Sequence, residues 1–257
     1  AWARLEPGEL GEGTLAFICH HKTGENLHTN IKLALPPDRI NVSDFFEPFG
    51  RVPYSQRSKT IHLVRDPVDM ILSGYRYHRE KWHGEIWDWG HKKLQDPQCF
   101  MCDDKDHDVM FDTCHFNCTY FELLSRVDET AGAIIEAISA RITITSMATT
   151  MSALAAQPGV LHLSFGLIKA DAAKTTACML KFLGLDGDKA LLKKMTSEVQ
   201  AVHDGDHATS GLHDDGGLKA HLRSHPVWGQ SFREVKDLMG EIFRRQADDY
   251  GCPAEEA

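Results

Sequence analysis

The sequence predicts an α/β fold in which helices flank a central parallel sheet, giving three layers. Three short apolar runs have the length of buried strands and lie between segments with helical periodicity. These runs span residues 14–19, 59–64 and 159–165. Strands that alternate with helices along a chain are typical of a parallel sheet with helices packed against it.

Residue types that start and stop helices frame the predicted helical segments. Asp66 caps free N–H groups and Pro67 fits a first turn, so a helix follows the second strand and runs to His78. Gly184 ends a helix over 172–183. Further helices are predicted over 26–35, 120–139, 140–156, 189–203 and 218–250, the last interrupted around 225–226. Residues 1–13 and 203–217 are predicted to be loops, and 42–46 to be extended.

The size and charge of the chain limit what it can be. Its 257 residues suit a single domain over 1–257, with an irregular Cys/Trp-rich insertion at about 80–118. Hydrophobic residues make up 42% and charged residues 25%, as in ordinary globular proteins. The net charge of −9 argues against nucleic acid as a partner. Any anion site must therefore be built locally from individual Lys and Arg residues.

We expect no membrane-spanning segment, because no run of about 18 apolar residues occurs. The chain starts at Ala1 and no signal-peptide pattern follows it. Membrane contact is therefore expected only through an N-terminal anchor that this sequence would lack.

Four of the seven cysteines cluster in the predicted insertion: Cys99, Cys102, Cys114 and Cys118. In an oxidising lumen disulfides would staple this cluster, whereas in the cytosol it would look like a zinc site; free thiols are the third alternative. Two glycosylation sequons, at Asn41 and Asn117, favour the secretory pathway slightly. We expect the Golgi lumen or secretory pathway, with a cytoplasmic location as the alternative, and we assign no metal ligand.

A basic turn follows the first predicted strand. Lys22-Thr23-Gly24 precedes a helix whose first turn offers free N–H groups and partial positive charge. Gly24 permits close backbone approach, Thr23 offers a hydroxyl and Lys22 a point charge. The pattern is not a Walker A motif, because no glycine stands five residues before Gly24. Alone, such a triplet usually marks an ordinary turn.

A second basic turn follows the second predicted strand. Arg65 stands at the end of that strand, and Ser73 follows eight residues later, two turns into the next helix. In an open parallel sheet, ligands bind at the carboxyl ends of the strands. Lys22 and Arg65 can therefore bind two separate phosphate groups of one nucleotide.

Together the two turns resemble the signature of sulfotransferases that use 3′-phosphoadenosine 5′-phosphosulfate (PAPS). That family carries K-[ST]-G-[TS]-[TS] and then R-[DN]-P-x5-S-x-Y, and this chain reads KTGEN at 22–26 and RDPVDMILSGY at 65–75. A third likeness is VLHLSFGLIKAD followed by KFLGL, although Phe165-Gly166 replaces Tyr-Glu. The likeness covers about residues 14–85 and 158–187 and implies a P-loop-like nucleotide-binding fold.

The resemblance implies that PAPS is the co-substrate and that no metal is required. Lys22 would stabilise the leaving phosphate, while Arg65 and Ser73 would hold the 3′-phosphate. The expected donor contacts are Lys22, Thr23, Gly24, Glu25, Asn26, Leu27, Arg65 and Ser73.

The resemblance also implies a general base and an acceptor. In this family the base is a His or Glu near the sulfate, and the candidates here are Glu47 and His78. The acceptor would be a hydroxyl or amine of a glycan or small molecule. Its specificity is expected in residues 38–58 and 80–118.

Glu25 departs from the family pattern, which has Thr or Ser at this position. Like charges about 4 Å apart cost on the order of 4 kcal/mol at an effective dielectric near 20, which would weaken donor binding severely. We expect the Glu25 side chain to point away from the ligand, with only its N–H facing it. The alternative is a catalytically degenerate binding protein of this fold, and a P-loop-like nucleotide kinase is disfavoured because the Walker spacing is absent.

Overall fold

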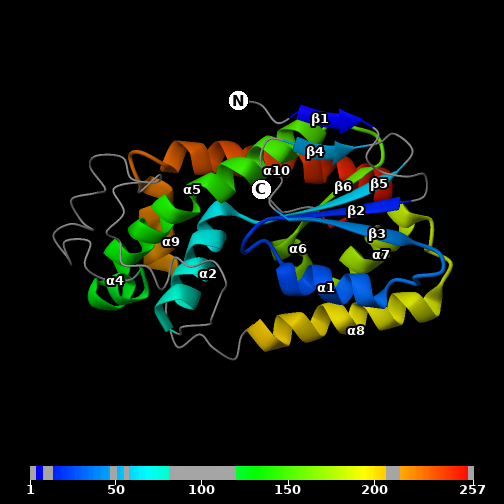
Figure 1. The fold of residues 1–257 in the computed structure, drawn as a ribbon, viewed down its shortest axis with the longest axis horizontal. Helices are drawn as coiled ribbons and strands as arrows, with labels where there is room; N and C mark the ends of the chain where they lie inside the picture. The colour runs from blue at the N-terminus through cyan, green and yellow to red at the C-terminus, as the bar shows by residue number, and fades with distance from the viewer. Residues whose placement is uncertain are drawn as a thin grey trace. The chain divides into compact units, whose positions relative to one another are not determined.

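The computed structural model describes residues 4–7, 14–46, 51–54, 58–80, 120–206 and 215–253 (Figure 1). The described chain divides into two compact units. The first, called the sheet unit here, comprises Ala1–Asp66, Thr145–Thr209 and Glu234–Ala257. The second, called the helical unit, comprises Pro67–Ile144 and Ser210–Arg233. The predicted insertion lies almost wholly outside the described residues, and the single domain stays a prediction.

Four parallel strands form the main sheet of the sheet unit, in the order β3-β2-β5-β6 (Figure 1). Their bounds are Thr14–Cys19 for β2, Asn41–Phe46 for β3, Lys59–Val64 for β5 and Val160–Ser164 for β6. The predicted parallel sheet with flanking helices is therefore confirmed. The three apolar runs singled out in the sequence match β2, β5 and β6 to within one residue at each end.

A second, two-stranded parallel sheet pairs β1, Arg4–Pro7, with β4, Arg51–Tyr54. The prediction of a loop over 1–13 was wrong for the four residues of β1. Strand formation depends on the partner strand as much as on local propensity, so a segment with Glu and Pro can still pair.

The helices of the sheet unit are α1, Glu25–Ala34, α6, Phe165–Ala170, α7, Ala172–Leu183, and α8, Lys189–Asp206. The helix predicted over 172–183 is confirmed, and Gly184 closes it with a left-handed φ of 77°. The third strand ends one residue earlier than predicted. Ser164 accepts the N–H of Gly166 and so caps α6, a helix that the sequence analysis missed.

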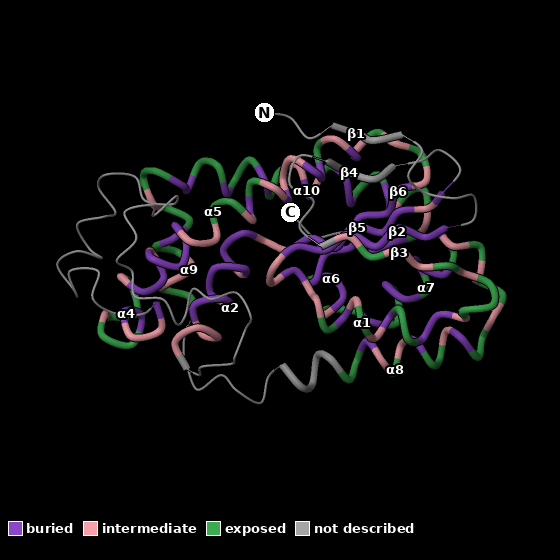
Figure 2. The backbone as a smooth tube through the Cα atoms, viewed as in Figure 1, coloured by how far each residue is buried: buried purple, intermediate pink, exposed green. Residues whose placement is uncertain are grey.

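Three strands of the main sheet, β2, β5 and β6, are buried on both faces, while the edge strand β3 is partly exposed. Phe17 and Cys19 enter the core formed with α1, α7 and α8, whereas Ile18 packs on the opposite face with Leu154 and Val160. Figure 2 shows β2, β5 and β6 as buried along their length. This two-sided burial explains why these strands are continuous apolar runs instead of alternating patterns.

The helical unit contains α2, Pro67–Glu80, α4, Tyr120–Arg126, and α9, Asp215–Ser224. Two long helices, α5, Glu129–Leu154, and α10, Gly229–Tyr250, contribute residues to both units. The predicted boundary between helices at 139 and 140 was wrong. The break lies at 127–128, where the carboxylate of Asp128 accepts the N–H of Ala131 and caps α5.

By length and composition alone, α5 could cross a membrane, and it is the one such helix in the part of the chain that the structure describes. Its most apolar window is 44% buried inside the protein. A core helix of a globular protein meets the same criteria, so this is weak support for a membrane span.

A disulfide joins Cys178 of α7 to Cys252, just beyond α10. Both cysteines belong to the sheet unit. The clustered cysteines in the insertion lie outside the described residues, so the choice between disulfides, zinc and free thiols there stays open.

Candidate anion site at the strand ends

The loop after β2 is held by Thr23. Its hydroxyl accepts the N–H of His20 at 2.9 Å and donates to the carbonyl oxygen of His20 at 2.8 Å. The N–H of Thr23 donates to the same carbonyl at 3.0 Å, and the residue is fully buried. Thr23 therefore builds the turn. The turn itself uses both donors of this residue, and the predicted contact of Thr23 with the donor stays a prediction.

The loop backbone is bent into unusual conformations. Lys22 has a φ of 62° and Gly24 a φ of 126°. A left-handed non-glycine residue costs about 1–2 kcal/mol, so the surrounding contacts must hold Lys22 in place. At Gly24 a Cβ would lie 3.2 Å from the Phe165 ring, and glycine avoids both the crowding and the strain.

The N-terminus of α1 keeps its backbone donors available. The first helical hydrogen bond runs from the N–H of His28 to the carbonyl oxygen of Gly24. The N–H groups of Glu25, Asn26 and Leu27 therefore have no partner within the helix, and no side chain in the described ranges caps it at Gly24. Leu27 is buried in the core, so only its backbone could meet a ligand.

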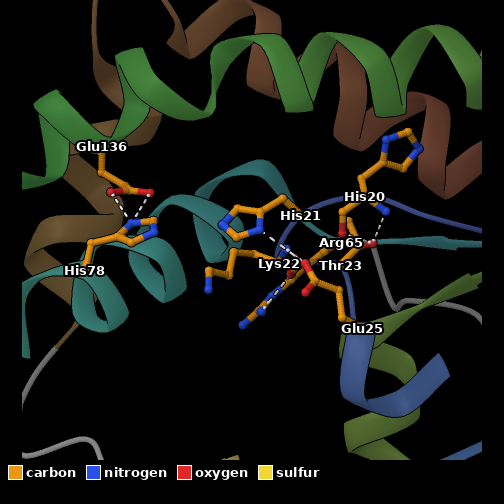
Figure 3. A network of polar contacts seen from close by, with 8 residues as sticks. All are labelled: His20, His21, Lys22, Thr23, Glu25, Arg65, His78 and Glu136. Carbon is orange, nitrogen blue, oxygen red and sulfur yellow. Dashed lines mark hydrogen bonds and ion pairs between the residues drawn. The ribbon is translucent and has the colours of Figure 1, made fainter. Parts of the chain in front are cut away.

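Arg65, at the end of the neighbouring strand β5, reaches the same loop. Its guanidinium donates to the carbonyl oxygen of Lys22 at 3.0 Å and lies 4.8 Å from the centroid of the Phe165 ring. Figure 3 shows the Lys22 and Arg65 side chains extending toward the same side of the view. The two basic residues singled out from separate turns are thus joined by a direct contact.

The carboxylate of Glu25 turns back onto the loop. It accepts the N–H of Lys22 at 3.3 Å and lies 3.2 Å from Nδ1 of His21 (Figure 3). The expectation that this side chain points away was therefore wrong. The loop N–H groups are strong donors, and the Glu25 carboxylate accepts one of them.

The remaining predicted residues lie elsewhere. Ser73 is on α2, in the helical unit, so its convergence with Arg65 stays a prediction. Glu47 lies outside the described residues.

In the helical unit, His78 is paired with a buried carboxylate that the sequence analysis missed. Nδ1 of His78 lies 3.0 Å from Oε2 of Glu136, and the hydroxyl of Tyr120 donates to the same oxygen at 2.7 Å (Figure 3 shows the His78–Glu136 pair). Burial, and then the Glu136 charge, raise the pKa of Tyr120 well above its usual value, so the phenol remains a donor. The sequence signal for this network was a single acidic residue, Glu136, within the apolar run IIEAIS.

Three further histidines form a buried ladder across the sheet. Nε2 of His20 lies 3.0 Å from Nε2 of His62, and Nδ1 of His62 lies 3.0 Å from Nδ1 of His162. Burial lowers the pKa of His20 and of His162 to about 3, and burial followed by the two neighbouring rings lowers that of His62. The neutral ring of His62, in the middle, donates through one nitrogen and accepts through the other, so the two hydrogen bonds run in one direction along the ladder.

The histidines of the ladder lie in a line and do not converge on one point. Among the described residues, no group of three His, Cys, Asp or Glu side chains is arranged to hold a metal ion. The strands KTIHLV and VLHLS each place a His among apolar residues, which was the signal for this feature in the sequence.

Comparison with known proteins gives a loose likeness. Eleven chains of solved structures match. One is the crystal structure of mouse sulfotransferase SULT7A1 complexed with PAP, with 13% sequence identity, 94% of this chain and 86% of that chain covered, and a TM-score of 0.37. No family model matches the chain, and no curated protein matches it. A likeness this loose does not indicate the function of this chain.

Proposed function

We propose that this protein is a PAPS-dependent sulfotransferase acting on a hydroxyl or amine of a small-molecule or glycan acceptor. The observation that carries the proposal is the hydrogen bond from the Arg65 guanidinium to the carbonyl oxygen of Lys22. It joins the ends of two adjacent parallel strands, where open α/β sheets bind their ligands. Two cations at one strand edge suit a ligand with two separate phosphate groups.

The reaction would be an in-line displacement at sulfur. The acceptor oxygen or nitrogen attacks sulfur, the bond from sulfur to the bridging oxygen breaks, and the electron pair stays on the phosphate that leaves. Lys22 and the free N–H groups at the start of α1 would stabilise that oxygen. Arg65, together with Ser73, would bind the 3′-phosphate and so distinguish PAPS from nucleotides without it.

One observation favours a second candidate, a binding protein of this fold that has lost the donor site. The Glu25 carboxylate already accepts the N–H of Lys22, where a phosphosulfate oxygen would bind. If the carboxylate stays there, it excludes the donor by repulsion on the order of 4 kcal/mol. The two candidates differ in whether the donor displaces this carboxylate from the Lys22 N–H.

The disulfide between Cys178 and Cys252 supports our proposal of a secretory or Golgi location. Disulfides form and persist in oxidising compartments and are rare in the cytosol. A free-thiol count on protein isolated from its native source tests this location, because a cytosolic protein would show both thiols reduced.

Titration with adenosine 3′,5′-bisphosphate tests the proposed function. A sulfotransferase should show a higher melting temperature at micromolar bisphosphate without magnesium. Lys22→Ala and Arg65→Ala should each weaken binding roughly 10- to 100-fold, because each removes charge-assisted contacts to phosphate. Lys32→Ala and Arg39→Ala are matched controls, since both cations are largely exposed in the same unit.

Normal binding by Lys22→Ala or Arg65→Ala would contradict the assignment. Stabilisation by Mg-ATP alone would indicate a kinase, and no response to either nucleotide would favour the binding protein.

A further inference from the structure

The side chains of His21 and Glu25 form a pair at the loop after β2, residues 20–24, which is called the anion loop here. The two residues are four apart in sequence, and Nδ1 of His21 lies 3.2 Å from Oε1 of Glu25. Both side chains are partly exposed, at 26% and 39%. His21 directly precedes Lys22, so its ring is on the loop that would hold the phosphosulfate.

The contact sets the tautomer of the His21 ring. A carboxylate has no proton to donate, so Nδ1 of His21 must be the donor in this pair. In the neutral ring the lone pair then lies on Nε2, the other ring nitrogen. A histidine whose Nδ1–H is held by a carboxylate is the arrangement that prepares an imidazole to accept a proton.

The carboxylate also makes a second contact on the loop. The N–H of Lys22 donates to the same oxygen at 3.3 Å, and Glu25 is the first residue of α1. Thr29, one turn later, donates its hydroxyl to the Glu25 carbonyl oxygen at 3.1 Å. The Lys22 N–H therefore ties the carboxylate to the loop backbone, while the Thr29 contact involves only the main chain of Glu25.

We propose that His21 is the general base of the sulfuryl transfer and that Glu25 is the residue that positions it. The inference rests on the proposed function and deepens it. Nε2 of His21 takes the proton of the acceptor hydroxyl as the acceptor oxygen bonds to sulfur. The sulfur–oxygen bond to the phosphate breaks, its electron pair stays on the phosphate, and the imidazolium later gives its proton to solvent.

The proposal accounts for an acid in an anion-binding loop. An isolated carboxylate would repel the donor, but one that holds an imidazole N–H is partly neutralised. As His21 gains the proton of the acceptor, the imidazolium and the carboxylate become an ion pair of zero net charge. The negative charge of Glu25 then stabilises the cation that the reaction creates, while Lys22 next to it balances the leaving phosphate.

The test compares His21→Gln and Glu25→Gln with the wild type, and His221→Gln serves as an exposed histidine control. Two quantities are measured: the dissociation constant of adenosine 3′,5′-bisphosphate, and kcat for its release from PAPS with water, 4-nitrophenol or N-acetylglucosamine as acceptor. His21→Gln should lower kcat roughly 10²- to 10⁴-fold, with the dissociation constant within about threefold of wild type. Glu25→Gln should lower kcat at least about tenfold, and His221→Gln should match the wild type.

The pH profile distinguishes a base from a structural residue. In the wild type, kcat should fall on the acid side, and this limb should vanish in His21→Gln. The proposal is overturned if His21→Gln keeps kcat within threefold, if it loses bisphosphate binding together with turnover, or if the wild type binds bisphosphate but releases none from PAPS. A wild type that does not bind bisphosphate overturns the proposed function instead.

Discussion

Two histidine–carboxylate pairs, one in each compact unit, share the same contact but differ in burial. On the anion loop, Glu25 is 39% exposed and pairs with His21. In the helical unit, Glu136 is 4% exposed, pairs with His78 and also receives the Tyr120 hydroxyl. The same two functional groups are therefore accessible to water and ligands on the loop but buried in the helical unit.

The difference in burial sets what each pair can contribute. An exposed ion pair contributes little stability, because water competes for both partners. A buried carboxylate that loses its donors retains an uncompensated charge, which is strongly destabilising. The Glu136 pair is thus suited to holding helices together, whereas the Glu25 carboxylate can give up the Lys22 N–H to a ligand at low cost.

The largest loss of stability is expected in the helical unit, from replacing Glu136, the acceptor that His78 and Tyr120 share. Glu136→Ala leaves His78 and Tyr120 without this acceptor and opens a cavity, so it should lower the free energy of unfolding by about 3 kcal/mol. Urea denaturation measures the loss. The control is Glu129→Ala, whose exposed pair with Arg79 predicts a change below about 1 kcal/mol. If Glu136→Ala lowered the free energy of unfolding no more than the control does, the contrast between the buried and the exposed pair would be contradicted.

In the histidine ladder, by contrast, the buried rings are paired with one another and not with a carboxylate. The folded-state pKa of His20 and of His162 is lowered to about 3, and that of His62 is also lowered. The stability that the three neutral rings contribute is therefore fully present above the pKa of histidine in the unfolded chain, which is near 6.5. It is lost as the pH falls below 6.5. From pH 7 to pH 6 the three rings together should cost about 2 kcal/mol.

Urea denaturation at several pH values measures this loss. His62→Gln, which removes one of the three rings, should make the slope shallower by about a third. A stability that does not change between pH 7 and pH 6 would show that the rings are not held neutral.

A smaller effect is expected where α2 approaches Glu136. A Cβ on Gly74 would lie 2.1 Å from Oε1 of Glu136, so Gly74→Ala forces the carboxylate to move. We expect a loss of about 1–2 kcal/mol in the free energy of unfolding. Gly187→Ala is the matched control, because nothing lies within 4 Å of the added methyl group. Equal melting temperatures for the two variants would show that the Glu136 carboxylate is not confined.

The smallest effect on stability is expected on the loop. Glu25→Gln should change the free energy of unfolding by less than about 1 kcal/mol, because the pair that it weakens is exposed. The same urea experiment measures it. A loss as large as that from Glu136→Ala would mean that Glu25 holds the loop together, in which case the two pairs would not differ in kind.

The sequence predicted the features whose causes are local. Continuous apolar runs located β2, β5 and β6, Gly184 located the end of α7, and the strand-end positions of Lys22 and Arg65 predicted their convergence. Each of these depends on a few neighbouring residues and on one general rule of parallel sheets.

Features that depend on register or on distant partners could not be read from the chain. The ladder needs the pairing of His62 with His162 across two strands, and the Glu136 network needs α2, α4 and α5 in contact. The hydroxyl of Thr23 and the carboxylate of Glu25 each had two possible partners, backbone or ligand. Only the folded turn shows that both side chains bind the backbone.

The bond between Cys178 and Cys252 also bears on how the protein should be produced. It closes a loop of 74 residues, and in the chain-entropy picture such a cross-link contributes about 4 kcal/mol. The net free energy of folding of an ordinary domain is only about 5–15 kcal/mol, so protein made in a reducing bacterial cytosol would lack a large part of it. Expression in the periplasm or in secreting eukaryotic cells would preserve the cross-link and give material fit for the binding measurements above.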